Sequence, residues 1–135
     1  KFIKQDIKGV FLITHKCFED KRGFFSRVYC KKFFNKLKFN PVQTNISFNK
    51  NKHTLEDFII KFQNHQKEFV SCIKGKIYDI IIDLRKNSKT YKKWISFELN
   101  SKSLYSIFIP PGCANAFLTL ENETIVFYHT SNFYN

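Results

Sequence analysis

Short strand-like segments, each closed by a turn signal, recur along almost the whole chain. One covers Gly9–His15, and Phe69–Ile73 and Lys76–Leu84 flank the pair Lys74-Gly75. Segments rich in Val, Ile, Phe, Tyr and Thr between turn-forming residues are typical of β-strands. Roughly nine such segments and one short helix predict an all-β fold, an antiparallel barrel or sandwich.

Local patterns predict how these segments connect. Lys74-Gly75 predicts a hairpin whose second strand is buried along much of its length. Asp20–Gly23 predicts a turn before an extended segment, Phe24–Tyr29. The spacing of apolar residues within Cys30–Phe39 predicts one short amphipathic helix. Further strands are expected over Val42–Phe48, Trp94–Leu99, Leu104–Ile109, Ala116–Leu120 and Thr124–Tyr128.

The length of the chain bounds its organisation. With 135 residues, 43% of them hydrophobic, it is long enough for one packed domain and too short for two. We therefore expect a single domain over residues 1–135. No apolar run is long enough to span a bilayer and no secretory signal is visible, which predicts a cytoplasmic protein without a membrane partner.

The net charge of +12 has two interpretations. A basic face could bind nucleic acid, and such binding would weaken steeply with salt. The lysines, however, are spread along the whole chain among many Asn, Ile and Phe residues, a mixture typical of A/T-rich codons. We therefore predict no nucleic-acid partner, although the positive field would suit an anionic small substrate.

The cysteines and histidines form no recognisable metal pattern. The four cysteines include no Cys-x-x-Cys pair, and the four histidines form neither His-x-His nor His-Glu-x-x-His. Zinc sites usually show such spacings, so no metal site and no cofactor are predicted. Without a secretory signal the thiols are expected to be reduced.

Six strings, in order and at matching spacing, make the chain similar to a known family. They are Phe18–Phe25, Val42–Ser47, Gly75–Arg85, Ser88–Trp94, Ile109–Ala114, and Val126–Tyr128 with Phe133-Tyr134. Together they resemble the dTDP-4-dehydrorhamnose 3,5-epimerase family, a branch of the cupins. The resemblance implies a jelly-roll barrel, a homodimer, and a nucleotide-linked 4-keto sugar bound inside the barrel without a metal.

The resemblance also implies roles for two residues. Tyr128 matches the catalytic tyrosine, which donates a proton; its alternative is a barrel-lining aromatic residue with a satisfied hydroxyl. Arg22 matches an arginine that binds the diphosphate, where a planar guanidinium suits phosphate oxygens. Its alternative is a surface arginine in a turn.

Five further positions match substrate-binding residues of the family. Gln43 and Asn45 match polar barrel residues near the sugar or pyrophosphate, and Asn115 keeps a hydrogen-bond donor where the family has histidine. Phe25 and Tyr134 match aromatic residues that flank the nucleotide base. For Gln43, Asn45, Phe25 and Tyr134 the alternative is a purely structural role. For Asn115 the change from histidine is mild, because asparagine can still donate a hydrogen bond.

The segment that should hold the catalytic base departs from the family. The family string T-L-R-G-F-H-Y-Q reads Thr54–Lys61 here, with Glu56 at the arginine position and Ile59 at the histidine position. Isoleucine cannot accept a proton, and a carboxylate repels a diphosphate. The family's enolate-stabilising lysine falls at Glu68. His53 and His65 are nearby candidates for a substitute base, but His65 lies in a polar segment, and a solvated loop histidine is its simpler interpretation.

We hypothesise that a shift in reading frame accounts for this departure. In A/T-rich codons R-G-F-H-Y-Q is AGA GGA TTT CAT TAT CAA; when one further A follows, removing the first A yields GAG GAT TTC ATT ATC AAA, the codons for Glu-Asp-Phe-Ile-Ile-Lys, the residues at 56–61. The domain is also expected to be incomplete at its C-terminus. Two functions remain: an epimerase with an impaired catalytic segment, and a non-catalytic barrel that binds a nucleotide sugar.

Overall fold

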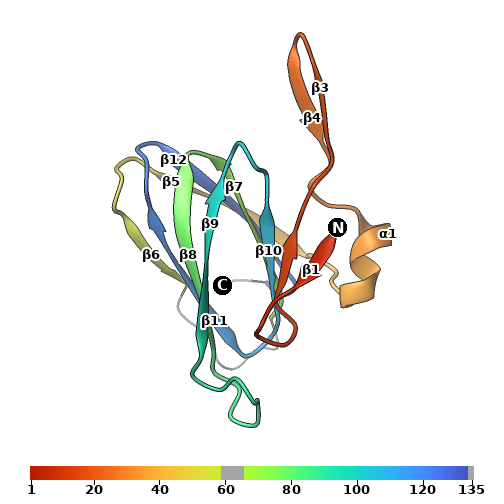
Figure 1. The fold of residues 1–135 in the computed structure, drawn as a ribbon, viewed down its shortest axis with the longest axis vertical. Coiled ribbons are helices and arrows are strands. Elements are labelled where there is room, and N and C mark those ends of the chain that lie inside the picture. The colour runs from red at the N-terminus through yellow and green to blue at the C-terminus, as the bar shows by residue number, and fades with distance from the viewer. Residues whose placement is uncertain (59–65, 134–135) are drawn as a thin grey trace.

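A computed structural model describes residues 1–58 and 66–133, with the backbone alone at 57 and 58. Its strands form a six-stranded sheet in the order β1-β2-β10-β7-β12-β5, a four-stranded sheet in the order β6-β11-β8-β9, and a separate hairpin, β3-β4 (Figure 1). Their bounds are β1 Phe2–Lys4, β2 Phe11–Ile13, β3 Cys17–Asp20, β4 Gly23–Ser26, β5 Gln43–Asn49, β6 Leu55–Phe58, β7 Glu68–Lys74, β8 Lys76–Asp83, β9 Trp94–Asn100, β10 Ser106–Ile109, β11 Cys113–Thr119 and β12 Thr124–Thr130. All described pairings are antiparallel, and the predicted all-β jelly roll is confirmed.

The main core fills the space between the two sheets. Alternate residues of β8 are buried, as expected for a strand with one face inward. From that face Ile77 and Ile81 meet Val70, Val126 and Phe117 of the neighbouring strands, all almost fully inaccessible to solvent. Burial of large apolar side chains is the main force that holds two sheets face to face.

A second apolar cluster covers the outer face of the six-stranded sheet. The predicted helix divides into α1 (Lys31–Phe34) and a 3₁₀ turn, η1 (Asn35–Leu37), which ends where Lys38 takes a positive φ. Phe34 from α1 packs against Phe69 of β7, whose ring stacks on His129 of β12. His129 therefore faces away from the inner side, as its position next to Tyr128 predicts.

The predicted hairpin at Lys74-Gly75 is wrong. β7 pairs with β10 and β12, whereas β8 pairs with β11 and β9 in the other sheet. Gly75 has φ +78, and a Cβ there would collide with the Thr124 side chain. Glycine thus allows a sharp corner that carries the chain from one sheet to the other, and both strands then bury a face in the same core.

Other strand boundaries differ in detail. β4 ends at Ser26, so the extended segment predicted to Tyr29 is shorter. β1 and β6 were not predicted, because each is brief and lacks a clear apolar alternation. The segment of residues 85–92 is a loop between β8 and β9. None of the described helices is long and apolar enough to cross a membrane.

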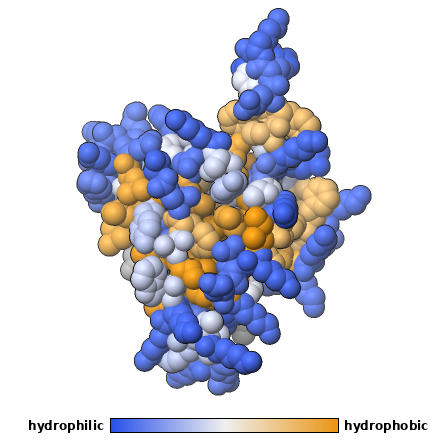
Figure 2. Space-filling view, viewed as in Figure 1, coloured by the Kyte–Doolittle hydropathy of each residue, from blue (hydrophilic) through white to orange (hydrophobic). Residues whose placement is uncertain are grey.

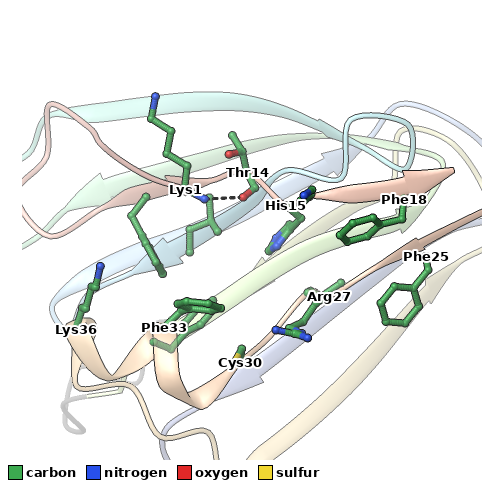
Figure 3. A pocket seen from close by; sticks show the side chains of 14 residues that line it. Lys1, Thr14, His15, Phe18, Phe25, Arg27, Cys30, Phe33 and Lys36 are labelled. Carbon is green, nitrogen blue, oxygen red and sulfur yellow. Dashed lines mark hydrogen bonds between the residues drawn. The ribbon is translucent and has the colours of Figure 1, made fainter.

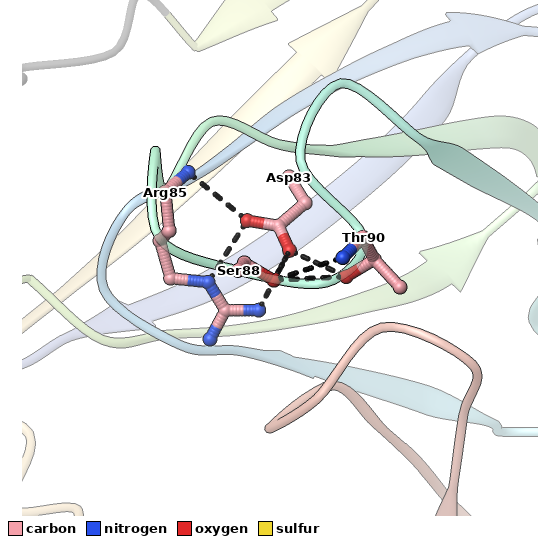
Figure 4. Close-up of polar contacts among 4 residues, drawn as sticks. All are labelled: Asp83, Arg85, Ser88 and Thr90. Atoms are coloured by element: carbon pink, nitrogen blue, oxygen red, sulfur yellow. Dashed lines mark hydrogen bonds and ion pairs between the residues drawn. The ribbon is translucent and has the colours of Figure 1, made fainter.

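The loop after β8 is organised by one buried carboxylate (Figure 4). Asp83 accepts hydrogen bonds from the backbone N–H and guanidinium of Arg85 and from the hydroxyls of Ser88 and Thr90. Burial alone would raise the pKa of Asp83, but these hydrogen bonds outweigh it and hold the pKa below its usual value. The carboxylate therefore stays ionised and fixes the loop at this end of the barrel.

The β3–β4 hairpin stands away from both sheets as an arm (Figure 1). Figure 2 shows a hydrophilic tip with apolar surface below it. On this arm Phe18, Phe24 and Phe25 are 54%, 57% and 66% exposed. An arm this apolar is a surface that a partner would be expected to cover.

Candidate functional site

Polar side chains line the inner face where β5 begins and β12 ends. In the β5–β12 ladder Asn45 pairs with Tyr128, and Gln43 pairs with Thr130. Residues of β5 at odd positions are partly or fully buried while Thr44, Ile46 and Phe48 are exposed, so Gln43 and Asn45 face inward. The Gln43 amide donates to Asn45 Oδ1 at 3.1 Å. Tyr128 packs against the main core from the same face.

The neighbouring strand β7 extends this inner surface. Glu68 pairs with Thr130 and Val70 pairs with Tyr128, so Glu68 is a diagonal neighbour of the tyrosine. Burial raises the pKa of Glu68, and the hydrogen bond from Gln66 Nε2 at 2.6 Å offsets part of that rise. The inner face is thus polar at this end and becomes apolar further in, where Val126 meets Cys72.

The opposite sheet contributes Asp79 from β8 and Asn115 from β11. Asn115 Nδ2 donates to Asp79 Oδ1 at 2.8 Å and to the Ile80 carbonyl at 3.1 Å. Burial raises the pKa of Asp79 to about 8, the hydrogen bond from Asn115 lowers it, and the charge of Glu68 raises it again. The amide donor that the sequence assigned to substrate is therefore engaged with Asp79.

Glu56 lies on the inner side of β6. It pairs with Phe117, an inward residue of β11, and Ser47 Oγ of β5 lies 3.5 Å from Glu56 Oε1. The charged residue types that the described strands turn into the interior are consequently all acidic: Glu56, Glu68, Asp79 and Asp83.

Two predicted substrate residues lie on the arm instead. Arg22 is at its tip, where its guanidinium forms a 2.6 Å ion pair with Asp20 and is almost fully exposed. Phe25 is on β4 and is also exposed. Within one chain neither joins Gln43, Asn45 and Tyr128. Tyr134, Ile59 and His65 lie outside the described residues.

A cavity of about 470 Å³ lies at the base of the arm (Figure 3). Its lining includes Phe18, Phe25 and Phe33 with His15 and Arg27, and it does not include Tyr128. His15 bonds to Ser106 Oγ at 2.8 Å, and burial lowers its pKa despite a hydrogen bond to the Arg27 backbone. This cavity is separate from the polar inner face.

No group of three or more His, Cys, Asp or Glu side chains in the described part of the chain is placed to hold a metal ion. The inner acids nevertheless form a feature that sequence reasoning missed. Asp79 sits at an inward position between Ile77 and Ile81, and a lone acid in such an alternating apolar run was the available signal.

Comparison with known proteins shows that the chain is similar to one enzyme family over almost its whole length. The sequence model of the dTDP-4-dehydrorhamnose 3,5-epimerase family matches residues 4–135. A dTDP-4-dehydrorhamnose 3,5-epimerase of Methanothermobacter thermautotrophicus is 34% identical over 99% of this chain and 73% of its own length. The corresponding Shigella flexneri protein is 33% identical over 98% of this chain and 75% of its own length.

Solved structures of epimerases of the same kind have a similar fold. The Bacillus anthracis dTDP-4-dehydrorhamnose 3,5-epimerase with TDP and PPi bound superposes with a TM-score of 0.93 at 32% identity, covering 100% of this chain and 79% of the other. The dTDP-6-deoxy-D-glucose-3,5-epimerase of Legionella pneumophila, in complex with dTDP-4-keto-L-rhamnose, superposes with a TM-score of 0.93 at 27% identity, covering 100% of this chain and 73% of the other.

Proposed function

The chain belongs to the dTDP-4-dehydrorhamnose 3,5-epimerase family, and from this premise we propose that it binds a dTDP-linked 4-keto-6-deoxy sugar in the polar end of its barrel and acts on the carbons next to the ketone. The observation that carries the proposal is the inward row of Gln43, Asn45 and Tyr128 on two paired strands. A polar row at one end of a sandwich whose main core is apolar is most simply explained by a polar ligand.

The chemistry follows from the ketone. Hydrogens on C3 and C5 are acidic because the adjacent carbonyl holds the electron pair as an enolate. A base removes one proton, and an acid returns one to the opposite face, which inverts the carbon. In this proposal Tyr128 is the acid, and Gln43 and Asn45 hold the sugar or its pyrophosphate. General acid–base transfer contributes about 10²–10⁴-fold in rate.

The same proposal implies that this sequence is impaired as an enzyme. Position 59, which matches the histidine base, is isoleucine, and positions 56 and 68 carry acids where the family has cations. Glu56 and Glu68 both face the interior, where an unscreened carboxylate disfavours a diphosphate. Binding of the nucleotide sugar is therefore expected to be weakened and proton abstraction to be lost.

The arm supports a homodimer. β5 is an edge strand of the six-stranded sheet, and its outer face exposes Ile46 and Phe48 at 64% and 57%. The β3–β4 arm of a second copy offers exposed phenylalanines that match this apolar strip. In such a dimer Arg22 and Phe25 of one copy would reach the nucleotide held by the other.

A second candidate function is binding of the nucleotide sugar without catalysis. The barrel keeps Gln43, Asn45 and Tyr128, and this second candidate is favoured by the isoleucine at position 59. Both candidates bind the same ligand, and only the exchange of sugar protons with solvent distinguishes them.

The test combines binding with exchange. Calorimetry with dTDP-4-dehydro-6-deoxyglucose should detect binding that Asn45→Leu weakens, with Thr44→Val on the outer face as the matched control. In deuterium oxide the epimerase candidate predicts deuterium at C3 or C5, and the binding-only candidate predicts none. We expect none from this sequence. Failure to bind any dTDP sugar would overturn both candidates.

A further inference from the structure

Asp79 is the most deeply buried acid of the barrel interior without a cationic partner among the described residues. It is 0% exposed, with Ile77 and Ile81 beside it on β8 and Phe117 opposite it on β11. A carboxyl group in such surroundings loses its hydration, and this loss is costly unless the group is neutral or fully hydrogen-bonded. The position therefore requires an explanation that core packing does not provide.

The hydrogen bonds of Asp79 are only half made. Asn115 Nδ2 donates to Oδ1 at 2.8 Å and is also held by the Ile80 carbonyl, which fixes the orientation of the amide. Within the described part of the chain, Asp79 Oδ2 and Asn115 Oδ1 have no hydrogen-bond partner, and both atoms are buried. Two unpartnered oxygens thus lie on one side-chain pair in the interior.

The proton on this acid has a defined place. With a pKa raised to about 8, Asp79 is protonated in most molecules at pH 7. Because Oδ1 accepts from Asn115, the proton resides on Oδ2, which becomes an O–H donor without an acceptor. Asn115 Oδ1 beside it is an acceptor without a donor.

Other titratable groups facing this interior do not neutralise Asp79. Among the described residues they are Glu68 from β7, Glu56 from β6 and Tyr128 from β12, together with Asp83, which is already paired with Arg85, and Cys72, whose pKa burial raises to about 12. None of these is a cation. The charge of Glu68 opposes ionisation of Asp79, so the protonated state is reinforced from across the sandwich.

A neutral acid that donates into a water-poor interior is suited to a carbonyl oxygen. Removal of a proton beside a ketone moves negative charge onto that oxygen, and a fixed donor there is stronger than water because it needs no reorganisation. The family lysine expected near this oxygen is replaced by Glu68, which cannot supply a positive charge.

We propose that Asp79 binds the ketone: its Oδ2, positioned by Asn115, donates a hydrogen bond to the 4-keto oxygen of the bound sugar. The proposal rests on the proposed function, since it takes the keto sugar as the ligand. It concerns binding and polarisation of the carbonyl and requires no turnover. Asn115 is in this scheme a positioning residue for Asp79.

The experiment uses the whole chain and two ligands that differ at C4. Calorimetry compares dTDP-4-dehydro-6-deoxyglucose with dTDP-6-deoxyglucose, which has a hydroxyl in place of the ketone, and infrared spectroscopy follows the carbonyl stretch of the keto sugar labelled with ¹³C at C4. Binding to the unmodified chain should lower the stretching frequency. Asp79→Leu should abolish that shift and weaken binding of the keto sugar about tenfold, while binding of dTDP-6-deoxyglucose is unaffected.

A second variant keeps the donor but removes its titration. Asp79→Asn places an amide that can donate at any pH, so the preference for the ketone should persist above pH 9, where the unmodified chain loses it. Circular dichroism checks that both variants fold. An unchanged carbonyl shift in Asp79→Leu, or equal weakening of both ligands, overturns the role of Asp79. If neither ligand binds the unmodified chain, the proposed function fails and this inference fails with it.

Discussion

Tyr128 lies directly opposite Asn45 in the ladder between β12 and β5, and both side chains face the interior of the sandwich. The pairing of backbone strands, rather than a flexible loop, therefore sets where the tyrosine ring stands relative to the amide. Its hydroxyl can be removed without disturbing the ladder, which makes the pair a sensitive place to test the proposed chemistry.

Restoring the family segment should create an active enzyme. The variant carries Glu56→Arg, Asp57→Gly, Ile59→His, Ile60→Tyr, Lys61→Gln and Glu68→Lys. The histidine supplies a base, and the two cations replace acids on the inner face, so deuterium should enter the sugar at C3 or C5. Mass spectrometry in deuterium oxide measures it. The control reverts position 59 alone to isoleucine and should lose exchange.

In the restored chain Tyr128→Phe should slow epimerisation by about 10²-fold or more, because the group that returns the proton is missing. Phenylalanine keeps the ring that packs on the core, so the unfolding temperature should stay close to that of the parent. Product formation followed by nuclear magnetic resonance measures the rate. Equal rates in the two chains would remove Tyr128 from the mechanism.

Asp83→Ala should lower the free energy of unfolding by about 3 kcal/mol, since it removes the acceptor that Arg85, Ser88 and Thr90 share. Ser88→Ala removes one donor and should cost about 1 kcal/mol. The pKa of Asp83 is lower in the folded chain than its unfolded value of about 3.9, so its contribution is complete above that value and lost as the pH falls through the folded pKa. Urea titrations at pH 7 and pH 3 test both points.

Asp79 should give the opposite pH dependence. Its folded pKa of about 8 lies above the unfolded value, so its contribution is fully present below about pH 4 and is lost as the pH rises to about 8. The slope should reach at most about 1.4 kcal/mol per pH unit. Asp79→Asn removes this component, and comparison of the two stability profiles between pH 4 and pH 9 measures it. Parallel profiles would contradict the raised pKa.

The arm predicts a concentration-dependent dimer. Phe24→Asp on the arm and Ile46→Lys on the outer face of β5 should each shift the mass measured by light scattering from dimer to monomer, because each places a charge in an apolar contact. Asp20→Asn at the arm tip is the control and should leave the mass unchanged. A monomer before any substitution would refute the proposed assembly.

Sequence periodicity predicted most of the strands because an alternating burial pattern is a local property. β5 and β8 alternate as the inner and outer faces of a sandwich require. Partner choice is not local, and the hairpin predicted at Gly75 failed for that reason. The same Lys-Gly pair serves a tight turn or a corner between sheets, and only the contact with Thr124 in the folded chain distinguishes them.

The candidate site could be predicted in part. The resemblance placed Gln43, Asn45 and Tyr128, and the structure sets them in paired rows on one face. The resemblance did not predict the hydrogen bond from Asn115 to Asp79, because that contact joins β11 to β8 diagonally. Nor could it place Arg22, whose arm leaves the body of its own chain.

The division of charge between surface and interior gives the protein two independent controls. Its excess lysines repel one another through solvent. Added salt should therefore raise the free energy of unfolding, because it screens this repulsion beyond about 10 Å at 0.1 M. Asp79 is fully buried, so dissolved salt screens its charge much less than it screens the surface lysines, and its ionisation follows the pH. A change in ionic strength therefore acts mainly on the surface lysines, whereas a change in pH acts on the buried carboxyl group of Asp79.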